Sequence, residues 1–129
     1  MNREIKFRAW DKTYSLMNYK VQVGNTDYAD QNYTCNSIWV DYGDKKSVGW
    51  MNADDKCIDL MQFTGLIDKN GNEIYEGDLV QHDAWNYPFE IIFNDEKARF
   101  VCKLQTGLTQ YIDCERLVVV GNIHETVSA

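Results

Sequence analysis

Several features that mark other protein classes are scarce in this sequence. It has one proline and eight glycines in 129 residues, which argues against a collagen-like or linker-like chain. Its longest purely aliphatic run, Leu117 to Val120, is far shorter than the roughly 20 residues of a membrane-spanning helix. The first ten residues, MNREIKFRAW, lack the continuous apolar segment of a secretory signal. We therefore expect a soluble protein of the cytoplasm with no membrane partner.

The four cysteines show no spacing typical of a metal site or a disulfide framework. Cys35, Cys57, Cys102 and Cys114 are 22, 45 and 12 positions apart, so no pair forms the Cys-x-x-Cys motif of zinc and redox sites. Without a secretory signal, disulfides are not expected either. The sequence therefore predicts reduced cysteines and no cofactor.

The charge is acidic and unevenly distributed. The net charge is -7, yet residues 1–20 carry five basic and two acidic side chains, and residues 61–129 carry five basic and eleven acidic ones. An acidic protein surface opposes non-specific nucleic-acid binding, because such binding depends on Lys and Arg side chains that neutralise phosphates. The basic N-terminal side chains are expected to form the solvated face of one strand: Arg3, Lys6, Arg8 and Lys12.

Residues 1–23 show the pattern of a β-hairpin. Apolar and charged side chains alternate from Ile5 to Trp10, which is typical of a half-buried strand. Asp11-Lys12 favours a turn, and the segment from Leu16 to Val23 can return as the second strand. Residues 24–59 are richer in Asn, Asp, Ser and Gly. They are expected to form a loop-rich insertion with one or two short strands, and acidic residues after Asn52 favour one short helix.

Residues 60–125 show alternating strand and turn signals. Asn70-Gly71 is a strong hairpin signal because both residues tolerate positive φ. Gly77 within the next strand suggests a bulge or sharp bend. Residues 89–104 read as a second hairpin, residues 113–116 as one helical turn, and residues 117–123 as a final buried strand. This predicts an all-β fold, with a small barrel or roll in the C-terminal half.

Four sequence motifs carry a family resemblance. They are REIKFRAWD, LMQFTGLIDKNGNEIYEGDLV, FEIIFNDEKARF and VVVGNIHE. Together they resemble the YopX family of phage and prophage proteins. The resemblance implies one domain over residues 1–129, an SH3-like barrel over residues 60–125, and a bacterial host cell. It brings no catalytic residues. The middle motif supplies residues expected to encode fold: Gly65, Asn70, Gly71, Glu76, Gly77 and Asp78.

Part of the middle motif is similar in composition to a calcium-binding loop. An EF-hand loop that began at Asp68 would need Gly at its sixth position and Glu at its twelfth. The sequence has Glu73 and Leu79 there, and the flanking segments are strand-like. The hairpin interpretation is therefore preferred, and no metal is expected.

Two histidines each precede a carboxylate, in His82-Asp83 and His124-Glu125. A histidine beside a carboxylate can act in acid–base catalysis. Neighbours on a strand point to opposite faces, however, so His82 and Asp83 are not expected to meet. His124 lies close to the C-terminus. Both are interpreted as surface histidines, and the protein is not expected to be an enzyme.

Aromatic side chains suggest a binding surface. Trp85 and Tyr87 fall in one loop, and Tyr75 and Trp10 could lie nearby. Exposed aromatics commonly anchor protein partners, although core or rim packing explains them equally well. The leading hypothesis is a small β-barrel module that binds a protein partner. The alternatives are a nucleic-acid-associated factor or acidic DNA mimic, and an enzyme of unknown class. Unpaired strand edges also suggest a homo-oligomer.

Overall fold

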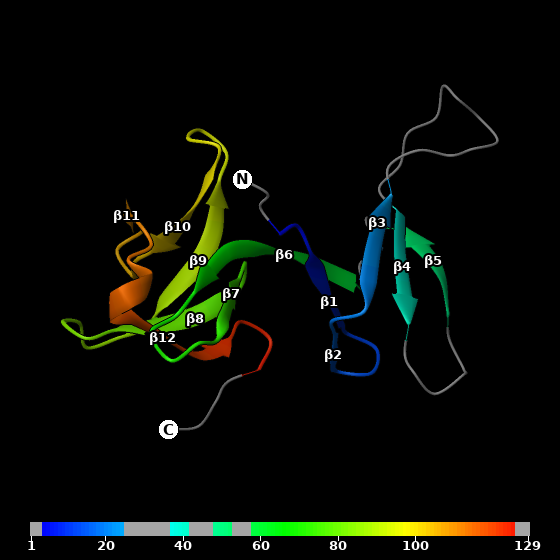
Figure 1. Ribbon diagram of the computed structural model, residues 1–129, viewed down its shortest axis with the longest axis horizontal. Coiled ribbons are helices and arrows are strands. Elements are labelled where there is room, and N and C mark those ends of the chain that lie inside the picture. Colours follow the sequence, from blue (N-terminus) through cyan, green and yellow to red (C-terminus); the bar gives the residue numbers. More distant parts are fainter. Residues whose placement is uncertain (1–3, 25–36, 42–47, 53–57, 126–129) are drawn as a thin grey trace. The chain divides into compact units, whose positions relative to one another are not determined.

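A computed structural model describes residues 4–24, 37–41, 48–52 and 58–125 of the chain (Figure 1). These residues form strands joined by turns, with one short 3-10 helix. The elements are β1 (Phe7–Asp11), β2 (Leu16–Asn18), β3 (Val21–Gly24), β4 (Ser37–Asp41), β5 (Val48–Asn52), β6 (Ile58–Ile67), β7 (Glu73–Tyr75), β8 (Asp78–His82), β9 (Phe89–Asn94), β10 (Arg99–Lys103), β11 (Thr109–Gln110), η1 (Cys114–Arg116) and β12 (Leu117–Asn122). The all-β prediction is confirmed.

Residues 5–62 form one compact unit. In this unit β1 pairs antiparallel with β2 on one edge and with the start of β6 on the other. β3, β4 and β5 form a three-stranded antiparallel sheet. The two strands predicted in the insertion are confirmed as β4 and β5. The helix predicted after Asn52 falls on residues 53–57, outside the described residues.

The N-terminal hairpin is confirmed for β1 and β2, but its return is interrupted. The strand expected from Leu16 to Val23 ends at Asn18, and β3 pairs with β4 instead. The side chain of Asn18 explains the break, because its Oδ1 accepts a hydrogen bond from the Lys20 amide at 2.7 Å. Such a local turn takes the backbone out of the ladder.

β1 is buried on both faces, which differs from the half-buried strand that was predicted. Arg8, Ala9 and Trp10 are only 3%, 1% and 7% exposed. The expectation that Arg8 lies on a solvated face is therefore wrong. Its guanidinium donates to the Met61 sulfur at 3.6 Å, and its long stem can cover apolar surface. Alternation records side-chain chemistry, and it does not reveal whether other side chains pack over both faces of the strand.

Residues 63–125 belong to the second unit, together with Glu4. Its main sheet has the strand order β11-β10-β9-β8-β12, is antiparallel throughout, and curls into a half-barrel (Figure 1). The second hairpin is confirmed as β9 and β10, the helical turn as η1, and the final strand as β12. Assignment of the half-barrel to the SH3-like class stays a prediction. The core consists of side chains that are at most 1% exposed: Ile74, Val80, Phe89, Ile91, Cys102 and Leu117.

The predicted hairpin around Asn70-Gly71 is confirmed between β6 and β7, and Asp68 organises it. The Oδ1 atom of this buried carboxylate accepts hydrogen bonds from the amides of Asn70 and Asn72 at 2.9 and 2.8 Å. Its Oδ2 atom accepts one from the amide of Val119, in β12, at 2.9 Å. Burial alone would raise the pKa of Asp68, but these backbone hydrogen bonds outweigh burial and lower it. Asp68 therefore fastens the hairpin to a strand 51 residues away.

The predicted bend at Gly77 is confirmed as the sharp turn between β7 and β8. Gly77 has φ +86°, its amide donates to the Ile91 carbonyl at 2.8 Å, and its carbonyl accepts from the Ile123 amide at 2.9 Å. Asp78 closes the turn, since its Oδ2 accepts from the Tyr75 amide at 2.7 Å. The turn thus connects β7, β9 and the end of β12.

Cys102 and Cys114 are thiols without a disulfide. Burial raises the pKa of Cys102 to about 11, so this core thiol stays protonated at neutral pH. Within the described residues, no helix has the length and apolarity that crossing a membrane requires.

Candidate functional site

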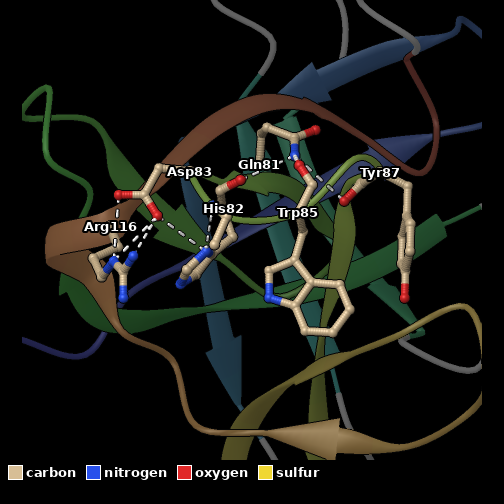
Figure 2. Close-up of polar contacts among 7 residues, drawn as sticks. Gln81, His82, Asp83, Trp85, Tyr87 and Arg116 are labelled. Carbon is tan, nitrogen blue, oxygen red and sulfur yellow. Dashed lines mark hydrogen bonds and ion pairs between the residues drawn. The ribbon is translucent and has the colours of Figure 1, made fainter.

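The loop between β8 and β9 is organised by Gln81, a residue that the sequence did not single out. The Gln81 side-chain nitrogen donates to the carbonyl of His82 at 3.1 Å and to that of Trp85 at 2.7 Å (Figure 2). A longer contact of 3.5 Å reaches the carbonyl of Tyr87. The amide of Trp85 in turn donates to the His82 carbonyl at 3.2 Å. One half-buried amide side chain therefore fixes the path of the whole loop.

His82 lies at the end of β8 and is 8% exposed, so the expectation of a surface histidine is wrong. Its Nδ1 accepts a hydrogen bond from the Ala84 amide at 3.0 Å, which places the proton of the neutral ring on Nε2. Asp83 Oδ1 lies 3.2 Å from the same Nδ1 atom, an attractive contact only when the ring is protonated. The backbone amide of Ala84 can only donate, so its bond requires an Nδ1 atom without a proton. We therefore assign this bond to the neutral ring.

The expectation that His82 and Asp83 point apart is also wrong. It assumed that the strand continues through Asp83, whereas β8 ends at His82 and Asp83 lies in the turn. Strand alternation no longer applies there. The two side chains therefore meet, as Figure 2 shows.

Asp83 also pairs with Arg116, the last residue of η1. The Arg116 Nη2 lies 2.9 Å from Asp83 Oδ1, and its Nε donates to the two carboxylate oxygens at 3.1 and 3.3 Å. The Arg116 guanidinium holds the pKa of Asp83 below its usual range, and Asp83 raises the pKa of Arg116. Both side chains are about half exposed, so salt weakens the pair and its effect on stability is small. The pair mainly ties the loop to η1.

Three aromatic rings meet at the entry to β9. Trp85 packs edge-on against Tyr87 and against Phe89, with ring centroids 5.9 and 5.5 Å apart, and Tyr87 meets Phe89 at 5.6 Å. Phe89 is fully buried, Tyr87 is half-buried, and Trp85 is 40% exposed. The buried ring therefore supports the outer two, and Trp85 presents apolar surface to solvent.

The other two predicted partner-binding aromatics, Tyr75 and Trp10, are buried. Tyr75 is 4% exposed and packs against Phe63, with centroids 5.4 Å apart. Trp10 is buried in β1, in the other unit. Neither side chain is an exposed aromatic, so the expectation of a binding role is corrected for both. Within the second unit, the structure brings Trp85 and Tyr87 together.

The residues of the family motif hold turns and strand ends. Gly65, Gly71 and Gly77 all have positive φ, near +87°. Asn70 and Gly71 form the tip of the β6–β7 hairpin, and Glu76 and Asp78 flank Gly77. His124 lies in the turn after β12, where its amide donates to Asn122 Oδ1 at 2.9 Å.

The site combines a buried histidine, an ion pair and an exposed aromatic ring. Among the described residues, no hydroxyl or thiol is hydrogen-bonded to His82. In the same part of the chain, no three His, Cys, Asp or Glu side chains gather as they would around a metal ion. What the site offers is an ordered loop, an exposed indole and a neighbouring ion pair. This combination can bind another molecule.

Replacing Gln81 by glutamate is expected to loosen the loop. A carboxylate cannot donate, so it would face the carbonyls of His82 and Trp85 with negative charge. We expect the free energy of unfolding to fall by about 1–2 kcal/mol, and the backbone amides of Trp85 and Tyr87 to exchange faster with solvent. Hydrogen exchange measured by NMR checks this. Gln105→Glu, which adds the same charge in an exposed turn, is the control; equal exchange in both variants would contradict the assignment.

Comparisons with known proteins agree with the fold. The family model described as YopX protein matches residues 6–128. The crystal structure of protein EF1440 from Enterococcus faecalis is similar, with a TM-score of 0.61 and 27% sequence identity over 95% of each chain. A search of curated proteins gave no match.

Proposed function

The chain belongs to the YopX family, and from this premise we propose that it binds a protein partner through the loop between β8 and β9. Trp85 carries the proposal, because its ring is 40% exposed while its backbone carbonyl is held by Gln81 at 2.7 Å. An aromatic side chain on an ordered loop loses little freedom when it enters a partner's pocket. The protein would act as an accessory factor in the cytoplasm of a bacterial host, without catalysis.

Charge supports a protein partner over a nucleic acid. Residues 61–129 carry eleven acidic and five basic side chains. At the loop itself the Arg116 cation is already paired with Asp83 at 2.9 Å. A nucleic-acid surface needs several unpaired cations to neutralise phosphates. A nucleic-acid-associated factor therefore remains the second hypothesis, and the same experiment separates the two.

Trp85→Ala is expected to abolish most partner capture. Tagged wild-type protein and the variant would be incubated with host lysate, with and without nuclease, and the bound proteins quantified by mass spectrometry. Because buried interface aromatics often contribute 2 kcal/mol or more, recovery of a true partner should fall about tenfold or more. Trp85→Phe should retain part of the binding, since a smaller ring still fills part of the pocket.

The matched control is Tyr14→Ala, which removes an equally prominent aromatic that is 70% exposed in the other unit. It should leave recovery unchanged. Equal recovery by wild type and Trp85→Ala would remove the loop as the binding surface. Bound protein that disappears after nuclease treatment would favour the nucleic-acid hypothesis.

A second copy of the chain is one partner that can be tested directly. Strand edges invite pairing between chains, so the proposal includes a homo-oligomer. Light scattering at micromolar concentration should then give a mass above the 15.1 kDa of one chain. A monomer mass would exclude self-association and leave the heterologous partner.

A further inference from the structure

Arg99, the first residue of β10, carries a charge that the described residues leave unneutralised. Its guanidinium carbon lies 4.4 Å from the centroid of the Tyr111 ring. Its Nε is buried and has no hydrogen-bond acceptor within residues 4–24, 37–41, 48–52 and 58–125. In those ranges it forms no ion pair with a carboxylate either. The guanidinium therefore has no carboxylate partner within the described residues, and an anionic acceptor that a ligand brings to its Nη groups would be favoured.

The surroundings of Arg99 prepare its guanidinium for a planar anion. Tyr111 follows β11, which pairs with the far end of β10, and its ring supports one face of the guanidinium. A face held against a ring leaves the N–H edge as the direction for hydrogen bonds. Across the ladder Arg99 is opposite Asn94, which carries no charge. Lys103, two side chains further along the same face of β10, is instead opposite Glu90. Of these two cations on one face of β10, Lys103 has an acidic neighbour across the ladder and Arg99 does not.

Exposed apolar surface accompanies the cation. The Tyr111 ring against which the guanidinium lies is itself 70% exposed. An anion alone would need no such surface, whereas a peptide that carries an acidic side chain could use it through its neighbouring residues.

We propose that Arg99 and Tyr111 form a docking site for a glutamate or aspartate carboxylate in an acidic peptide segment of a protein partner. The Arg99 edge would donate to both oxygens of the carboxylate, and Tyr111 would keep the guanidinium in plane with it. One guanidinium presents one pair of parallel N–H donors, and this pair matches the two oxygens of one carboxylate. A nucleic acid would need several phosphate contacts, which the acidic residues 61–129 do not offer.

This site is separate from the Trp85 loop, so it does not rest on the proposed function. Trp85 lies just before the first residue of β9, and Arg99 pairs with Asn94, the last residue of β9. The two sites therefore occupy opposite ends of one strand. A variant at one site is expected to leave the other intact.

The test is an NMR titration of the whole isotope-labelled chain with an acetylated Gly-Glu-Leu-Glu-Gly peptide. The Arg99 Nε–H signal and the Tyr111 ring signals should shift and saturate, and the matching Gly-Gln-Leu-Gln-Gly peptide should leave them unchanged. Arg99→Gln should weaken binding, followed at Tyr111, on the order of tenfold or more. Arg99→Lys keeps the charge without the fork and should give an intermediate affinity. Tyr111→Leu should also weaken binding.

Lys97→Gln is the control, because it removes an exposed cation from the turn between β9 and β10 and should not change the affinity. Equal binding of the Glu and Gln peptides would overturn the proposal, as would an affinity that Arg99→Gln leaves unchanged. Shifts caused by a single-stranded DNA 12-mer but not by the Glu peptide would also overturn it. If Arg99→Gln fails to fold, Arg99→Lys and Tyr111→Leu decide the question by the same criterion.

Discussion

Asp68→Asn is expected to lower the free energy of unfolding by roughly 2–4 kcal/mol. The Asp68 carboxylate accepts hydrogen bonds from the amides of Asn70, Asn72 and Val119, and donates none. Asparagine has nearly the same shape but replaces one oxygen with a donor. Whichever way the new amide turns, its NH₂ group faces at least one backbone N–H from which it cannot accept a hydrogen bond. The loss should therefore exceed that of an ordinary surface substitution.

Chemical denaturation of wild type and variant measures this loss. Asp95→Asn is the control, because Asp95 is exposed in the turn between β9 and β10 and the substitution changes the net charge equally. The control should stay within about 0.5 kcal/mol of wild type. If both variants lose the same stability, net charge and not the hydrogen-bonded carboxylate is responsible.

The pKa of Asp68 gives this stabilisation a pH dependence. Hydrogen bonds to the ionised form outweigh burial, so the folded protein holds the pKa of Asp68 below its usual range. A lowered pKa means that the stabilisation is complete above the unfolded value, about 3.9, and is lost as pH falls through the folded value. The stability difference between wild type and Asp68→Asn should thus be constant near neutral pH and shrink below about pH 4. A difference that persists undiminished in acid would show that Asp68 is not ionised when folded.

Local signals in the sequence predicted much of the C-terminal half. Asn70-Gly71 identified a hairpin because its residues tolerate positive φ, and the structure places Gly71 at +88°. The polar turn between β9 and β10, and the one-turn helix η1, were likewise encoded within a few residues. Each of these elements depends on chemistry close in the chain, which is why one sequence sufficed.

Long-range pairing could not be obtained in this way. Nothing near Asp68 indicates that its carboxylate reaches the Val119 amide, 51 residues later. The alternation in β1 suggested one solvated face, but Arg8 and Trp10, which share that face, are buried. Such contacts depend on which strands become neighbours, and local pattern does not determine this.

For the same reason, only part of the candidate site could be predicted from the sequence. Trp85 and Tyr87 share a loop, so turn signals on either side identified them together. Gln81 has no sequence signature, since its role depends on backbone carbonyls that converge only after the loop has folded. Arg116 meets Asp83 across 33 positions, so this contact also required the structure.

Gly77→Val is expected to be the most destabilising glycine substitution in the family motif. Gly77 has φ +86°, a conformation that costs a non-glycine residue about 1–2 kcal/mol and a β-branched residue more. Gly77 is also buried, and its amide and carbonyl bond to Ile91 and Ile123. The backbone therefore cannot relax without breaking contacts to β9 and to the segment after β12. A loss of roughly 3 kcal/mol or more in the free energy of unfolding is expected.

Gly71→Val separates backbone strain from this packing. Gly71 has nearly the same φ, +88°, but lies in an exposed turn where an added Cβ meets no atom within 4 Å. It should lose only the strain that the positive φ imposes on a β-branched residue, roughly 2 kcal/mol. Thermal and denaturant unfolding of the two variants should therefore rank Gly77→Val below Gly71→Val, with partner binding lost only in proportion to unfolding. A variant that keeps wild-type stability but loses binding would show that this motif contacts the partner directly.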